Sequence, residues 1–113
     1  MRQFNQAYID GRFVPVHGET VVHSVNPATE QVIATAILAN RDDAKAAINA
    51  ASRAQRSLGQ TGKSERIEML RQLQAAVLAH ADDIRDVTIE EYGAPASRAQ
   101  WVSQYASQCF ART

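Results

Sequence analysis

The chain has 113 residues, and its 12 Lys and Arg residues balance its 12 Asp and Glu residues. Zero net charge argues against a nucleic acid or an anionic membrane as partner, because both select a basic surface. The single cysteine, Cys109, excludes an internal disulfide and predicts a reducing, cytoplasmic location. No apolar run approaches the ~18–20 residues of a membrane span, and the N-terminus lacks the apolar region of a signal peptide.

The first expected element is a β-hairpin over residues 8–14. The dipeptide Asp10-Gly11 supplies the positive φ angles that a two-residue type I′ turn requires. Pro15 has no amide proton, so we expect it to end the pairing or to lie at a sheet edge.

Two further strands are expected at residues 20–25 and 32–37, with a turn at 26–30 between them, and they are predicted to pair as a second hairpin. Two isolated hairpins are marginal in water, because three or more strands with a packed face are normally needed. These strands are therefore expected to need a packing partner outside the hairpins.

The chain turns helical after residue 40. Asn40 is a good N-cap, and Asp42 and Asp43 favour the positive end of the helix dipole. Gly59 and Gly62 are expected to end this first helix. Its apolar stripe is predicted from residues three and four apart, namely Ala44, Ala47, Ile48, Ala51, Ala54 and Leu58.

The second helix is expected from about Thr61, with a kink or short break at residues 80–83 where the period drifts. Its apolar stripe is predicted from Ile67, Leu70, Leu73, Val77, Ala81, Ile84 and Val87. Gly93 ends this segment and Pro95 starts the next helix. That last helix is predicted to carry Ala99, Val102, Ala106 and Cys109 on one face.

The predicted fold class is therefore α+β, with β-hairpins in residues 1–40 followed by three to four α-helices in residues 41–113. The chain reaches Thr113 without a helix-ending signal, so we expect it to be cut from a longer sequence.

Few residues suggest chemistry. Cys109 lies on an apolar stripe and is predicted to be buried and inert. Glu90 and Glu91 are adjacent on a helix and point about 100° apart, so they do not converge. His17 and His23 have no acid nearby in the sequence and are expected at ordinary surface positions.

The segment 59–64 ends in Gly-Lys-Ser, as a phosphate loop does. It lacks the first glycine of that motif, because Ser57 stands there, and it follows a helix instead of a strand. We expect a helix–helix turn.

Five segments together resemble the NAD(P)-dependent aldehyde dehydrogenase superfamily, in the right order and at the right spacing. They are Tyr-Ile-Asp-Gly-Arg-Phe-Val at 8–14, Val-Asn-Pro-Ala-Thr-Glu-Gln-Val-Ile-Ala at 25–34, the amphipathic helix at 42–51, Glu-Arg-Ile-Glu-Met-Leu at 65–70 and Glu-Glu-Tyr-Gly-Ala-Pro at 90–95. The chain departs from the family pattern at Gln31 for the usual Gly-Glu, at Gln55 and Leu58 for an aromatic pair, and at Ala94 for a lysine.

The resemblance implies that both regions belong to one incomplete coenzyme-binding domain. In the family a cysteine thiolate attacks the aldehyde, a hydride passes to NAD(P)⁺, and a water activated by glutamate releases the acid. The catalytic and cofactor-binding residues lie beyond the equivalent of residue 113. We therefore expect no catalytic or cofactor-binding residue in this chain, no dehydrogenase activity of the chain alone, and the remainder of an aldehyde dehydrogenase chain as its partner.

The resemblance also implies part of a monovalent cation site. Several family members bind such an ion through backbone carbonyls of the two residues before Asn-Pro and through an acidic residue two before the corner glycine. The matching positions are Ser24, Val25 and Glu91. Hard cations prefer such oxygen ligands.

A second hypothesis stays open at this point. The alanine-rich helices and spare strands are also compatible with a non-catalytic helical interaction or self-association module, in which apolar stripes are buried against another chain.

Overall fold

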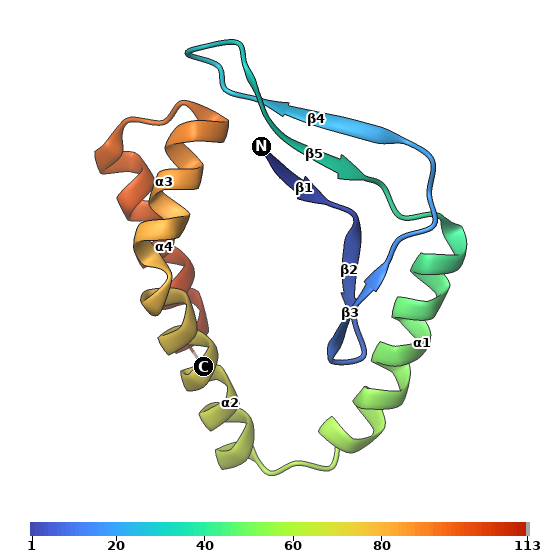
Figure 1. Cartoon of the computed structure of the whole chain (residues 1–113). Coiled ribbons are helices and arrows are strands. Elements are labelled where there is room, and N and C mark those ends of the chain that lie inside the picture. The colour runs from blue at the N-terminus through green and yellow to red at the C-terminus, as the bar shows by residue number, and fades with distance from the viewer. Residues whose placement is uncertain (113) are drawn as a thin grey trace. The chain divides into compact units, whose positions relative to one another are not determined.

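The structure is a computed structural model that describes residues 1–112 (Figure 1). It forms two compact units. The first contains residues 1–25 and 31–60, and the second contains residues 26–30 and the chain from residue 61. All five strands and the first helix belong to the first unit, and three helices belong to the second. The expected α+β class with strands before helices is confirmed.

The strands of the first unit form two sheets. Their bounds are Arg2–Phe4 (β1), Gln6–Ile9 (β2), Arg12–Pro15 (β3), Val21–Val25 (β4) and Val32–Ile37 (β5). The hairpin β2–β3 is a sheet by itself, and the second sheet has the order β1-β5-β4 (Figure 1). Both predicted hairpins are confirmed, since β2 pairs with β3 and β4 with β5 in antiparallel register.

The turns follow from local chemistry. Asp10 (φ 55°) and Gly11 (φ 77°) both lie in the left-handed region, as a type I′ turn demands. Pro15 is the last residue of β3 and pairs with Gln6 at the open end of the hairpin, as predicted. Strand β1 precedes the hairpin in the chain and belongs to the second sheet, where it pairs with β5 in parallel. The sequence pattern did not predict β1.

Helix α1 spans Arg41–Leu58 and begins at the predicted N-cap. The Asn40 Oδ1 atom accepts hydrogen bonds from the backbone N–H of Asp42 and of Asp43, both at 3.0 Å. The Asp43 carboxylate accepts in return from the Asn40 backbone N–H at 3.0 Å, which completes a capping box.

The predicted apolar stripe of α1 is confirmed only in part. Ala47, Ala51 and Ala54 line a groove against the hairpin, but Ile48 and Leu58 are exposed, and the buried residues of α1 are Asp43 and Ala50. The reason is that α1 packs against β2 of the small hairpin. A two-stranded hairpin is too narrow to cover a broad apolar face.

The second unit contains α2 (Lys63–Ala79), α3 (Ala81–Tyr92) and α4 (Ala96–Ala111). The expected break occurs at His80, and Gly93 (φ 70°) ends α3 in the left-handed conformation. Two boundaries differ by one position, because Gly62 and not Thr61 is the N-cap of α2, and Pro95 is the N-cap of α4 and not its first helical residue. Helix α4 packs along both α2 and α3.

Small residues form the contact face of α4. Ala99, Ser103 and Ser107 lie four apart and are buried. Each serine hydroxyl donates to a carbonyl of its own helix, Ser103 to Gln100 at 3.1 Å and Ser107 to Gln104 at 2.9 Å. The serines can therefore be buried without a polar partner on a neighbouring helix.

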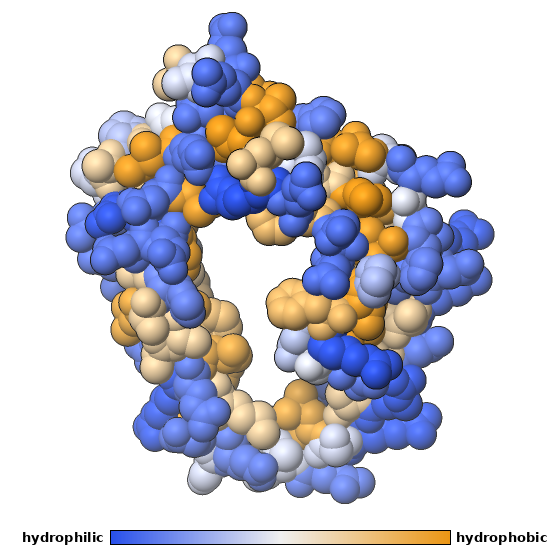
Figure 2. Space-filling view, viewed as in Figure 1, coloured by the Kyte–Doolittle hydropathy of each residue, from blue (hydrophilic) through white to orange (hydrophobic). Residues whose placement is uncertain are grey.

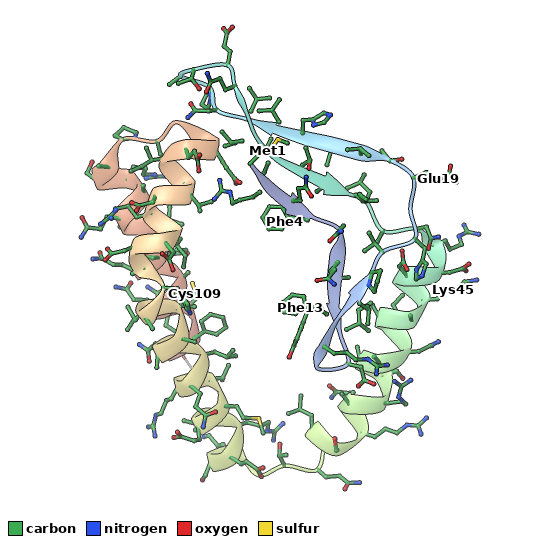
Figure 3. The ribbon with its side chains drawn as sticks, viewed as in Figure 1. Met1, Phe4, Phe13, Glu19, Lys45 and Cys109 are labelled. Carbon is green, nitrogen blue, oxygen red and sulfur yellow. The ribbon has the colours of Figure 1, made fainter. Side chains whose placement is uncertain are left out.

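Both units leave apolar side chains uncovered (Figure 2). In residues 1–112 the buried apolar residues are Ala34, Ala50, Ala94 and Ala99, all alanines. Phe4 and Phe13 on the strands, by contrast, are more than half exposed (Figure 3). Within the same residues, no helix combines the length and apolarity that a bilayer crossing requires.

Candidate functional site

The most connected polar cluster of the first unit surrounds the start of α1 and consists of His17, Asn40 and Asp43. The His17 Nδ1 atom lies 2.6 Å from Asp43 Oδ1, and the His17 backbone N–H donates to Asp43 Oδ2 at 2.8 Å. The Asn40 amide donates to the His17 carbonyl at 3.2 Å. The cluster thus fixes the segment before β4 onto the N-terminus of α1.

The electrostatics of this cluster are dominated by the carboxylate. Hydrogen bonds from the His17 side chain, then from the backbone N–H groups of His17 and Asn40, lower the pKa of Asp43 from 3.8 to about 2. Asp43 is only 8% exposed, whereas the His17 side chain is 72% exposed. The His17 imidazole is therefore largely exposed to solvent.

His17 lies at the surface, as expected, but the prediction that it has no acidic partner is wrong. Its partner stands 26 residues further along the chain, so a search of the neighbouring sequence does not find it. The capping box at Asn40 was the one local signal that could have predicted a hydrogen-bonded Asp43 carboxylate at the start of α1. His23 is exposed, as expected.

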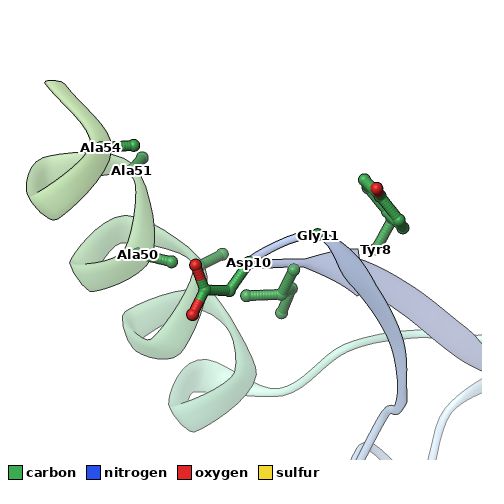
Figure 4. Close-up of a pocket in the computed structure, with 8 residues that line it drawn as sticks. Tyr8, Asp10, Gly11, Ala50, Ala51 and Ala54 are labelled. Atoms are coloured by element: carbon green, nitrogen blue, oxygen red, sulfur yellow. The ribbon is translucent and has the colours of Figure 1, made fainter. Parts of the chain in front are cut away.

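Beside this cluster, the β2–β3 hairpin and α1 enclose a groove in two parts. One part, of about 360 Å³, has the hairpin turn on one wall and alanines of α1 on the other (Figure 4). The other, of about 430 Å³, reaches from the hairpin to His17 and Asp43. An exposed ion pair between Arg53 and Asp10, 3.3 Å apart, crosses from helix to hairpin. The groove offers an apolar floor with a few charges at its rim.

The three positions of the predicted cation site lie on different units. Ser24 and Val25 are the last two residues of β4, and Glu91 lies in the last turn of α3. A β-bulge interrupts the β4–β5 ladder between Ser24 and Val25. The extra residue of this bulge is Ile33 of β5. The cation site stays a prediction.

The turn after β4 meets the corner after α3 within the second unit. Asn26 Oδ1 accepts from the Ala28 N–H at 2.8 Å, and the Asn26 carbonyl accepts from the Glu30 N–H at 2.8 Å. A Cβ atom on Gly93 would lie 2.8 Å from the Pro27 ring. The Asn-Pro turn and the Gly-Ala-Pro corner, which are 67 residues apart, therefore pack directly on each other.

Cys109 does not behave as predicted, because it is exposed on α4 (Figure 3). The buried line of that helix runs through Ser103 and Ser107, which places Cys109 beside the line and not on it. Among residues 1–112 no group of three His, Cys, Asp or Glu side chains could hold a metal ion.

The described residues do not fit a dinucleotide. Residues 59–64 join helix α1 to helix α2, as expected, and do not follow a strand. The one strand-to-helix connection in residues 1–112, at 38–40, contains no glycine. A dinucleotide pyrophosphate binds at a glycine-rich turn between a strand and a helix.

Comparison with known proteins assigns the chain to a family. Residues 13–112 match the model of the aldehyde dehydrogenase family. The chain is 35% identical over 95 residues to the 3-succinoylsemialdehyde-pyridine dehydrogenase of a Pseudomonas species, covering 84% of this chain and 20% of that protein. It is 40% identical over 86 residues to the lactaldehyde dehydrogenase of Escherichia coli, covering 76% of this chain and 18% of that protein.

Solved structures agree with this result. The crystal structure of E. coli lactaldehyde dehydrogenase superposes with a TM-score of 0.86 at 34% identity, over 94% of this chain and 22% of that one. A betaine aldehyde dehydrogenase of Staphylococcus aureus, solved in complex with NAD⁺, superposes with a TM-score of 0.83 at 24% identity, over 94% and 22%.

The chain belongs to the aldehyde dehydrogenase family. It corresponds to the N-terminal part of such an enzyme and spans about one fifth of the length of the relatives it matches. Members of this family bind NAD(P).

Proposed function

We propose that this chain is the N-terminal, non-catalytic part of an NAD(P)-dependent enzyme that oxidises a small aldehyde to a carboxylic acid. In this proposal the strands and helices belong to one coenzyme-binding domain, which the remainder of an aldehyde dehydrogenase chain completes. The cofactor then binds through that remainder, and the enzyme works in the cytoplasm, in keeping with an unpaired, exposed Cys109.

The observation that carries the proposal is the exposure of apolar side chains on both units. Large apolar residues are more than half exposed on each unit, among them Phe4 and Ile48 on the first and Tyr92 on the second. Soluble monomers rarely leave large contiguous apolar patches uncovered, and such patches mark interfaces. An enzyme body several times larger than the chain supplies the surface that these residues need.

A chimera tests the proposal. Residues 1–113 replace the matching N-terminal segment of E. coli lactaldehyde dehydrogenase, the 40% identical relative. We expect the chimera to fold and to reduce NAD⁺ with lactaldehyde, while the 113-residue chain alone does not. The control is the same enzyme body without any N-terminal segment, which we expect to be insoluble or inactive. NAD(P)H production by the chain alone, or an inactive and unfolded chimera, would contradict the proposal.

We further propose that Ser24 and Val25 carbonyls and the Glu91 carboxylate contribute to a monovalent cation site of the complete enzyme. The packing of the Asn-Pro turn on the Gly93 corner supports it, because Val25 directly precedes that turn and Glu91 stands two residues before Gly93. The chimera is expected to melt at different temperatures in sodium and in potassium buffers. Glu91→Ala should remove that difference, and the neighbouring Glu90→Ala should keep it. Equal melting of Glu91→Ala and its parent in both salts would sink the idea.

A further inference from the structure

We draw no further inference here: the strongest candidate, the groove between the β2–β3 hairpin and α1 that reaches His17 and Asp43, carries nothing because the chain spans about one fifth of the length of its relatives and nothing in the structure shows what covers this groove.

Discussion

Inside each of the two units, the helices are held in place by a different kind of contact. In the first unit, the connection to α1 depends on a carboxylate with several hydrogen-bond donors, at the cluster of His17, Asn40 and Asp43. In the second unit, α4 packs on α2 and α3 through Ala99, Ser103 and Ser107, whose side chains need no polar partner on another helix.

This difference teaches where each unit is vulnerable. A contact built from hydrogen bonds to one charge is sensitive to protonation and to loss of a cap. A contact built from small side chains is sensitive to added volume, because close-packed helices have no room to accommodate it. The single tryptophan, Trp101, stacks on Tyr105 with ring centroids 4.8 Å apart and can report on the second unit alone. Amide exchange in α1 reports on the first.

The largest effect is expected from Ala99→Leu, because Ala99 is fully buried on α4. Adding the larger side chain should lower the free energy of unfolding of the second unit by about 1–3 kcal/mol. Urea titration followed by Trp101 fluorescence measures it. Gln100→Leu, at the exposed neighbouring position, is the control and should change little. Equal effects of the two variants would show that volume does not limit this contact.

Gly93→Ala should destabilise the second unit by about 1 kcal/mol or more. Gly93 has φ of 70°, and an added Cβ would lie 2.8 Å from Pro27. The matched control is Gly62→Ala, since Gly62 has φ of −71° and open space around it, so this change should be neutral or mildly stabilising. The same fluorescence titration compares them. A neutral Gly93→Ala would show that the Asn-Pro turn does not pack tightly on this corner.

Asn40→Ala should lower the stability of the first unit by about 1 kcal/mol, the typical effect of losing an N-cap. Amide exchange at the start of α1 should accelerate, because the N–H groups of Asp42 and Asp43 lose their acceptor. Asn40→Ser retains a capping oxygen and should restore most of the protection. In both variants the midpoint of the urea transition followed by Trp101 fluorescence should stay unchanged. A parallel shift of this midpoint would show that the two units do not differ in this respect.

The smallest effect is expected from pH. The folded state lowers the pKa of Asp43 from 3.8 to about 2. Its contribution to stability is therefore complete above about pH 4 and is lost as the pH falls through 2. Amide exchange in α1, corrected for intrinsic rates, should show protection that falls over this range. Asp43→Asn should be less protected at pH 5 and flatter in its dependence, and an identical slope in the variant would assign the effect to other carboxylates.

The sequence was sufficient for elements that are decided locally. The Asp10-Gly11 turn, the Asn40 cap, the break at His80 and the Gly93 corner each depend on a few adjacent residues whose backbone preferences leave few alternatives. The family resemblance added what local rules could not, because it rests on the order and spacing of five separate segments, and the family is now shown.

The sequence failed where a distant partner decides the outcome. Strand β1 is three residues long and is defined by parallel pairing with β5, more than 30 residues away. The His17–Asp43 contact spans 26 residues. The predicted faces of α1 and α4 were right only in part. Hydropathy ranks Ile48 and Cys109 above Asp43 and Ser103, although the latter two are buried with their polar atoms satisfied.

The serine hydroxyls of α4 have a consequence for evolution of this helix. Ser103 and Ser107 donate hydrogen bonds to carbonyls of their own helix. The neighbouring helices therefore contact little more than a methylene group at each position. Serine and alanine are then nearly interchangeable there, so mutation can drift between them without a compensating change on α2 or α3. A helix that scores as polar along this line can thus stay buried through many substitutions, provided that each new side chain remains small.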